Sequence, residues 1–171
     1  NIQINNNKII RFKSSGLWFN RAAVDGVING NSIDGASMVG NGQLVFMNGP
    51  QSYAGIHITN NCLQNSIATG WFVDGNRNVG ASANGNPLVS GNTFSNNAGV
   101  GVNAGSRSLD KATISNNAFI GSGFDGFQGG PSNSSFTGNT FSKNHRWGLA
   151  LTSFGNTTAG SGAFNVTITG N

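Results

Sequence analysis

The sequence carries little charge and contains no glutamate. Its 171 residues include nine Lys and Arg against five acidic residues, all of them Asp, and only 8% of the chain is charged. Long helices and coiled coils need Ala, Glu, Lys, Leu and Arg in bulk, so these folds are excluded. No apolar run approaches the roughly 20 residues of a transmembrane helix, so we expect no membrane insertion.

Cysteine, metal-ligand spacings and clustered cations are also scarce. The single Cys62 rules out a disulfide framework. The sequence has no Cys/His metal spacing, no phosphate loop and no dense Asp cluster for calcium, so we expect no metal and no cofactor. The Lys and Arg residues are scattered without a run, which argues against a nucleic-acid partner.

Asparagine and glycine are abundant instead, with 28 Asn and 27 Gly. Such a composition raises the possibility of disorder, which usually goes with low hydrophobicity and high net charge. Here Leu, Ile, Val and Phe total 41 residues, including 12 Phe, and the net charge is only +4. The composition therefore favours a folded, β-rich chain long enough for one domain.

One six-residue phrase recurs along the whole chain: apolar, small polar, Asn or Gly, Asn, any residue, apolar. The first copy is Ile4-Asn5-Asn6-Asn7-Lys8-Ile9, and the chain stops inside the seventh copy. We call the fourth residue of each copy the anchor Asn. The seven anchors are Asn7, Asn31, Asn61, Asn92, Asn117, Asn139 and Asn171, separated by 24, 30, 31, 25, 22 and 32 residues.

A second phrase follows each anchor and is usually a Gly followed by apolar residues in alternation, as in Gly70-Trp71-Phe72-Val73. Alternation of period two predicts half-buried strands, so each repeat holds at least two short strands separated by a bend. Repeats of this kind stack as the coils of a parallel β-solenoid. Because Asn tolerates bends and stacked amides bond one another, we expect the anchors to form a ladder at one corner.

These phrases resemble the repeat of the pectate-lyase-like superfamily of parallel β-helices. The resemblance covers residues 1–171 and implies one all-β domain, a right-handed single-stranded parallel β-helix of about six to seven coils. Both ends lie inside a repeat, so we expect a piece of a longer solenoid. The superfamily includes polysaccharide lyases, glycoside hydrolases, alginate epimerases and phage tailspikes. The resemblance therefore implies an extracellular or virion-surface protein that acts on polysaccharide, and for a tailspike a homotrimer.

Alternation also predicts which side chains of the second phrase face outward. Phe46 and Phe124 are assigned inward by this pattern. One outward column is expected to hold Trp18, Val45, Phe72, Gly101, Asp125 and Ala150, and its neighbour Asn20, Met47, Asp74, Asn103, Phe127 and Thr152. Apolar residues on an outer face indicate a ligand groove, a subunit interface or a surface covered by a loop, and these alternatives stay open.

If this outer face is a ligand groove, its residues predict a site that cleaves polysaccharide. Asp74 and Asp125 lie two coils apart, about 9.6 Å by strand spacing, and an inverting glycosidase separates its two carboxyls by about 6.5–9.5 Å. We therefore assign the acid and base roles to these two residues. Substrate binding is assigned to the platforms Trp18 and Phe72 and to two polar residues, Asn103 and Arg77.

Two other functions compete with a polysaccharide-degrading domain. The first is a non-catalytic structural or adhesive stalk, because five Asp and no Glu leave few groups for catalysis. The second is an ice-binding face, because the outward positions of the first strand are rich in Thr and Ser, as in Thr167 and Thr169. Asn5, Asn29 and His57 interrupt the regularity of that face.

Overall fold

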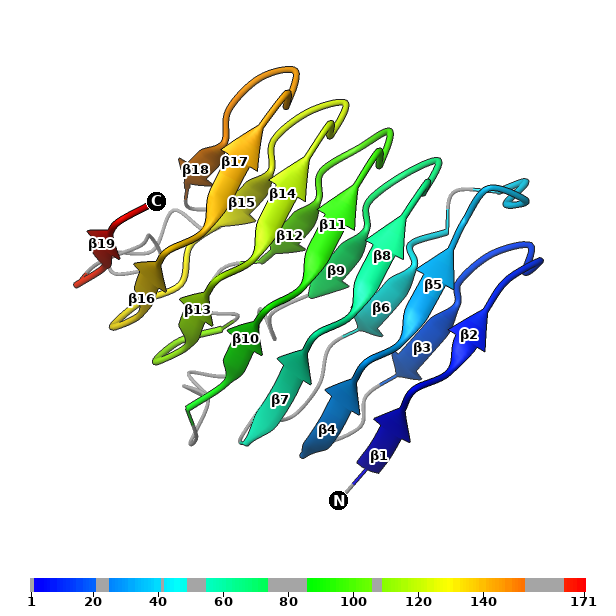
Figure 1. Ribbon diagram of the computed structural model, residues 1–171, viewed down its shortest axis with the longest axis horizontal. Coiled ribbons are helices and arrows are strands. Elements are labelled where there is room, and N and C mark those ends of the chain that lie inside the picture. The colour runs from blue at the N-terminus through cyan, green and yellow to red at the C-terminus, as the bar shows by residue number, and fades with distance from the viewer. Residues whose placement is uncertain are drawn as a thin grey trace.

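The protein is built of three parallel β-sheets that wrap around one core (Figure 1). The computed structural model describes residues 2–20, 25–40, 42–48, 55–73, 86–105, 109–152 and 165–171. These residues form strands and no helix, so none of them makes a helix able to cross a membrane.

Each of the first six coils contributes one strand to each sheet, and a seventh strand extends sheet A. Sheet A contains, in order, β1 (Ile2–Asn5), β4 (Gly26–Asn29), β7 (Ile56–Thr59), β10 (Leu88–Ser90), β13 (Thr113–Ser115), β16 (Ser135–Thr137) and β19 (Thr167–Thr169). Sheet B contains β2 (Lys8–Ile9), β5 (Ser32–Asp34), β8 (Cys62–Gln64), β11 (Thr93–Ser95), β14 (Ala118–Ile120) and β17 (Thr140–Ser142). Sheet C contains β3 (Leu17–Asn20), β6 (Val45–Asn48), β9 (Trp71–Val73), β12 (Val102–Ala104), β15 (Phe127–Gly129) and β18 (Leu149–Leu151).

Strands within each sheet pair in parallel with the equivalent strand of the next coil. In sheet A, for example, Ile28 pairs with Ile4 on one side and with Ile58 on the other. In Figure 1 the strands of sheets A and B run upward at the front, those of sheet C run back behind them, and the coils advance leftward, which makes the helix right-handed. The all-β parallel β-helix and the expected number of coils are therefore confirmed.

The geometry of the corner between sheets A and B explains the six-residue phrase. The residue before each anchor has a positive φ, between 55° and 67°, which only Gly and Asn adopt at low cost. These residues are Asn6, Gly30, Asn60, Gly91, Asn116, Gly138 and Gly170. The six-residue phrase thus spans two strands and the turn that joins them.

The anchor side chains point into this corner and bond from coil to coil. The backbone N–H and Nδ2 of Asn61 both donate to Oδ1 of Asn92, at 2.9 and 3.0 Å. Nδ2 of Asn92 donates in turn to the carbonyl of Ile58 and to Oδ1 of Asn117. The same pattern runs from Asn7 to Asn171. The ladder satisfies polar groups that would otherwise be buried without partners.

A shorter polar ladder lines the corner between sheets B and C, which we call the second corner. Oδ1 of Asn97 accepts the N–H of Ser66, and Oδ1 of Asn144 accepts the N–H of Ser122, each at 3.0 Å. Nδ2 of Asn144 also donates to the carbonyl of Phe119. Side chains therefore fix the loops that run beside the outer face of sheet C.

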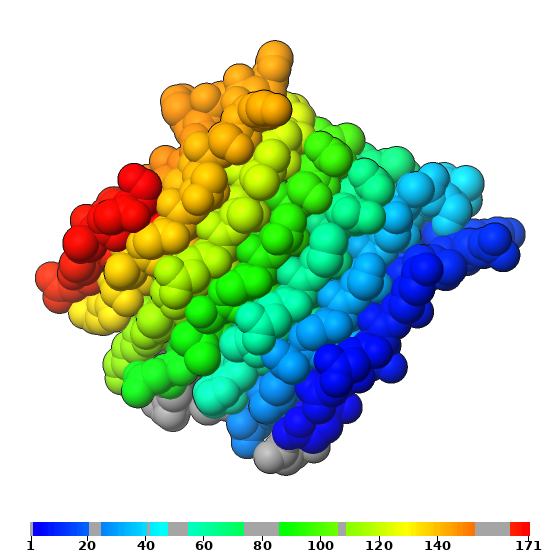
Figure 2. Space-filling view, in the orientation of Figure 1, coloured from blue at the N-terminus to red at the C-terminus, as the bar shows by residue number. Residues whose placement is uncertain are grey.

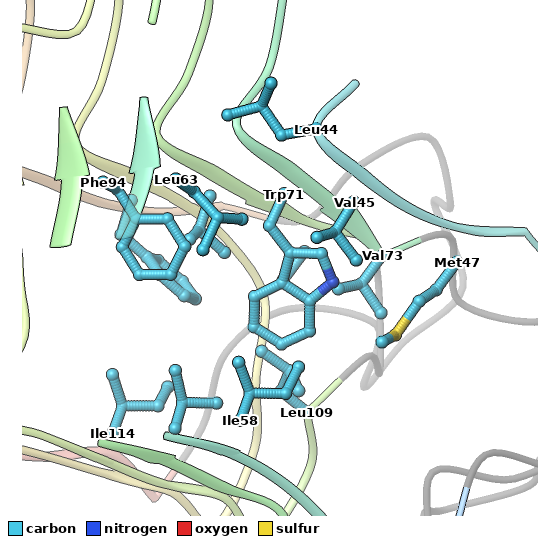
Figure 3. Packing of buried hydrophobic residues seen from close by; sticks show 14 of the residues in the cluster. Leu44, Val45, Met47, Ile58, Leu63, Trp71, Val73, Phe94, Leu109 and Ile114 are labelled. Atoms are coloured by element: carbon cyan, nitrogen blue, oxygen red, sulfur yellow. The ribbon is translucent and has the colours of Figure 1, made fainter. Parts of the chain in front are cut away.

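Apolar side chains from all three sheets fill the interior (Figure 3). Phe94, Phe119 and Phe141 from sheet B stack with centroid distances of 5.2 and 4.8 Å and nearly parallel rings. Trp71 from sheet C is almost fully buried beside Val45 and Val73. Because equivalent residues lie one above the other, the coils appear in Figure 2 as parallel bands in chain order.

Candidate functional site

The outer face of sheet C carries a column of aromatic and amide side chains. We call this the outer column of sheet C. The strand register places one residue of each coil in it, in the order Trp18, Phe46, Phe72, Asn103, Gln128 and Ala150. The first three coils therefore present aromatic rings, and the next two present amides.

The three aromatic residues form a continuous surface. The rings of Trp18 and Phe46 are stacked with centroids 6.3 Å apart, and those of Phe46 and Phe72 lie 5.5 Å apart at a tilt of 55°. Trp18 is 64% exposed, and the other two are half-buried. Side chains of this kind on an outer face are available for stacking against a flat ligand.

The facing assigned from the sequence was wrong in two coils. Val45, Met47 and Phe127 were assigned outward but point into the core, and each is at most 3% exposed. Phe46 was assigned inward but lies in the outer column of sheet C. The errors arise because the second coil has Leu44 where most coils have the corner Gly, and the fifth coil has two glycines that fit the phrase.

The fifth coil shows why its second glycine, Gly126, sets the register. A Cβ on Gly126 would lie 2.6 Å from the carbonyl oxygen of Gly148 in the next coil. The position directly before the strand must therefore be a Gly in this coil. Gly123, which the sequence phrase used, lies earlier in the second corner, so that phrase misplaced Phe124, which is 51% exposed.

Asp125 does not lie on the outer face of sheet C, contrary to the sequence prediction. Its side chain is fully buried in the second corner. The carboxylate accepts hydrogen bonds from Nε and Nη2 of Arg146 at 2.9 and 2.6 Å, and from the N–H of Trp147 at 3.2 Å. A carboxylate with its oxygens occupied in this way holds the corner together and presents no open face to a substrate.

Of the remaining assigned residues, the structure places Trp18, Phe72 and Asn103 in one column. Asp74 and Arg77 lie outside the described residues, so the expected separation of Asp74 and Asp125 stays a prediction. The described acidic residues other than Asp125 are Asp25, Asp34 and Asp110, and none of them belongs to sheet C.

A groove lies beside the outer column, along the second corner. Its volume is about 470 Å³, and Gln128 of the outer column forms part of its wall. The other lining residues are Ile67, Ala68, Thr69, Ala98, Gly99, Val100, Phe124 and Arg146. The column and the groove therefore form one continuous surface that combines aromatic, amide and cationic groups.

Arg146 is held rigidly at the edge of this groove. Its guanidinium lies 4.5 Å from the ring of Trp147 and 5.6 Å from that of Phe124, within the range of cation–π contacts. The hydrogen bond to Asp125 raises the pKa of Arg146 above its usual value. The sequence analysis did not select Arg146, Phe124 or Gln128 for this site.

Comparison with protein families agrees with this architecture. The family model described as "Right handed beta helix region" matches residues 78–171, which is more than half of the chain. The chain belongs to the right-handed β-helix family. No curated protein and no solved structure matches the chain.

Membership of the right-handed β-helix family explains the coils but assigns no chemistry to the outer face, because one fold hosts many functions. Within the described residues there is no group of three His, Cys, Asp or Glu that could hold a metal ion. The outer column of sheet C and the groove beside it offer a ligand aromatic rings, amides and the guanidinium of Arg146.

A second polar cluster lies on the outer face of sheet B. The hydrogen bonds that Asp34 accepts from Asn65, from the N–H of Ala36 and from Gln64 lower the pKa of its carboxyl. Burial raises the pKa of the Cys62 thiol, and the nearby charge of Asp34 raises it further. Asp34 is thus occupied by hydrogen bonds within its own coil and to the next one. A thiol with a raised pKa is a weak nucleophile at neutral pH, because less of it is thiolate.

Proposed function

We propose that this protein binds polysaccharide along the outer face of sheet C, as an extracellular or virion-surface β-helix. The observation that supports the proposal is the column of Trp18, Phe46 and Phe72 continued by Asn103 and Gln128. A tailspike that recognises surface glycans is the functional model for this proposal.

The chemistry of the column suits a chain of sugars. The apolar faces of sugar rings stack on aromatic side chains, and amide side chains both donate to and accept from hydroxyl groups. Strands are spaced about 4.8 Å apart, so the six coils of the outer column extend over about 24 Å. A long, shallow surface of repeated contacts fits an extended polymer better than a compact small molecule, which requires a deep pocket.

Cleavage of the polysaccharide is a finer proposal with less support. Glycoside hydrolysis uses a pair of carboxyl groups, and Asp125 is committed to Arg146 and Trp147. Any acid chemistry on this face would therefore depend on Asp74 with a partner other than Asp125. Asp74→Asn tests this point, because an unchanged release of reducing ends would exclude Asp74 from cleavage.

The binding proposal is tested by changing the aromatic column. Trp18→Ala and Phe46→Ala should each weaken binding to a responsive polysaccharide about tenfold, since removal of an interface aromatic costs more than about 1 kcal/mol. Affinity electrophoresis against a panel of neutral and acidic polysaccharides measures the change. Val39→Ala is the matched control, because Val39 is 76% exposed and lies outside sheet C.

Two outcomes would contradict the proposal. The first is that no polysaccharide of the panel binds the unaltered protein, or that both aromatic variants bind as well as Val39→Ala. The second is that Trp18→Ala converts a trimer to monomers in sedimentation velocity while glycan binding is unchanged. In that case the column is a subunit interface of the proposed homotrimer.

A further inference from the structure

The loop of the second corner in the sixth coil carries two exposed cations. Lys143 and Arg146 both lie there, between β17 and β18. The carboxylate beside Arg146, Asp125 of the fifth coil, is fully buried. This end of the second corner therefore exposes positive charge.

Arg146 is the cation of this set that lines the groove. A guanidinium has five N–H donors in one plane. Nε and one N–H of Nη2 are used by Asp125, on one side of the fork. Trp147 and Phe124 lie close to the guanidinium carbon and restrict the orientation of the plane. The edge formed by Nη1 and Nη2 remains, and the side chain is 40% exposed.

That remaining edge has the geometry of a carboxylate receptor. Two parallel N–H groups of an arginine match the two oxygens of a carboxylate, and such bidentate pairs are stronger and more directional than neutral hydrogen bonds. Asp125 acts here as a positioning residue, because it fixes the orientation of the fork from its buried side. The guanidinium is therefore preorganised before a ligand arrives.

The groove also connects to the surface proposed for polysaccharide. Gln128 belongs both to the outer column of sheet C and to the groove that Arg146 lines. A glycan lying along the column thus passes Gln128 at the point where a substituent can turn toward Arg146. Thr69, in the same lining, adds a hydroxyl to this region.

From this placement we infer that the groove beside Arg146 is a subsite for the carboxylate of an acidic sugar, so that the protein selects acidic polysaccharide over neutral polysaccharide. The inference rests on the proposed function, since the subsite binds a substituent of the same glycan. A neutral sugar would lie in the groove without using the paired donors of Arg146.

The test compares polymers that differ only in their carboxylates. Alginate, hyaluronan and polygalacturonate are each measured against the same polymer with its carboxyls reduced to alcohols, by calorimetry at 0.15 M salt. We expect the protein to bind at least one acidic polymer about tenfold more tightly than its reduced form, the effect of one charge-assisted bidentate contact.

Variants then assign the preference to Arg146. Replacing Arg146 alone would leave the buried carboxylate of Asp125 unpaired, so the informative variant is the neutral double substitution Asp125→Asn with Arg146→Gln. It should bind acidic and reduced polymers equally. Arg146→Lys, which keeps the charge and loses the fork, should retain part of the preference. Lys111→Gln removes one exposed charge outside the groove and should change the ratio less than twofold.

The possible results separate this inference from the proposed function. Equal binding of acidic and reduced polymers by the unaltered protein would overturn the subsite and leave polysaccharide binding intact. Retention of the preference in the double variant would also overturn it. Binding of single-stranded DNA or anionic vesicles as tightly as the acidic polymer would show a general attraction of anions instead. Failure to bind any polymer would overturn the proposed function itself.

Discussion

Removing one rung from the middle of the anchor ladder should destabilise the protein far more than removing one at its edge. In Asn92→Ala, the buried N–H of Asn61 loses its acceptor and the carbonyl of Ile58 loses a donor. A buried polar group left without a partner costs about 1–3 kcal/mol. The N–H left without a partner and the hydrogen bond lost at Ile58, which is worth about 1 kcal/mol, give an expected loss of about 2–4 kcal/mol, against a total stability of about 5–15 kcal/mol for an ordinary domain.

Asn7→Ala is the matched control for this prediction. Asn7 is exposed, and its side chain donates to the carbonyl of Asn5 and to Oδ1 of Asn31. Water can replace a donor at an exposed position, so this substitution should cost less than about 1 kcal/mol. The same change of side chain is thus compared at a buried and at an exposed rung.

Urea unfolding followed by far-UV circular dichroism measures both variants. The expected result is a lower midpoint for Asn92→Ala with an unchanged slope, because the surface exposed on unfolding is the same. If the free energies of unfolding of the two variants differed by less than about 1 kcal/mol, the side-chain ladder would contribute little to stability. The stability of the corner would then have to come from backbone pairing. A changed slope would instead show that the coils unfold separately.

Three further predictions concern single side chains. Gly126→Ala should cost about 1–3 kcal/mol by overpacking, whereas Gly40→Ala, whose Cβ would come no closer than 3.8 Å to Lys13, should be nearly neutral in thermal melting. Because the pKa of Asp34 is lowered in the fold, its carboxylate stabilises the protein above the ordinary Asp pKa of about 3.9, and this contribution is lost as the pH falls through the lowered value. The midpoint of Asp34→Asn should therefore fall less steeply with acid than that of the unaltered protein, and parallel pH profiles would contradict this. Because the pKa of Cys62 is raised, iodoacetamide should label it more slowly than a free thiol at pH 7.5, and labelling should accelerate in Asp34→Asn.

The fold was predictable because stacking makes the same demands on every coil. A left-handed turn residue followed by an inward Asn is required wherever sheet A passes to sheet B, and only Asn and Gly fill the turn. The restriction appears in the sequence as a phrase repeated seven times. The third strand of each coil was less visible, because the six-residue phrase covers the strands of sheets A and B together and was interpreted as one strand followed by a bend.

The outer column was predicted only in part, because the corner before sheet C tolerates several sequences. Counting from the anchors would have placed it correctly in five of the six coils: Trp18, Phe72 and Asn103 each follow their anchor, Asn7, Asn61 or Asn92, by 11 residues. Gln128 and Ala150 follow Asn117 and Asn139 by the same distance. Phe46 follows Asn31 by 15, because the second coil contains four additional residues before its strand.

The same count would have revealed the environment of Asp125. Asp125 and Trp147 both lie eight residues after an anchor, Asn117 and Asn139, so they occupy equivalent positions in adjacent coils. Arg146, directly before Trp147, must then lie beside Asp125. The charge pair was hidden because its members are 21 residues apart in a chain whose coils vary in length.

Inward and outward positions of this β-helix obey different rules, and only the outward positions are free to differ from coil to coil. An inward side chain must fit between equivalent residues of two neighbouring coils, so that column repeats similar residues, as in the stack of Phe94, Phe119 and Phe141. An outward side chain has no such constraint. The outer column of sheet C changes from Trp and Phe to Asn, Gln and Ala within six coils. The polysaccharide binding proposed above would use this freedom: aromatic rings at one end of the column can stack on sugar rings, and Arg146 beside the other end can bind an acidic substituent.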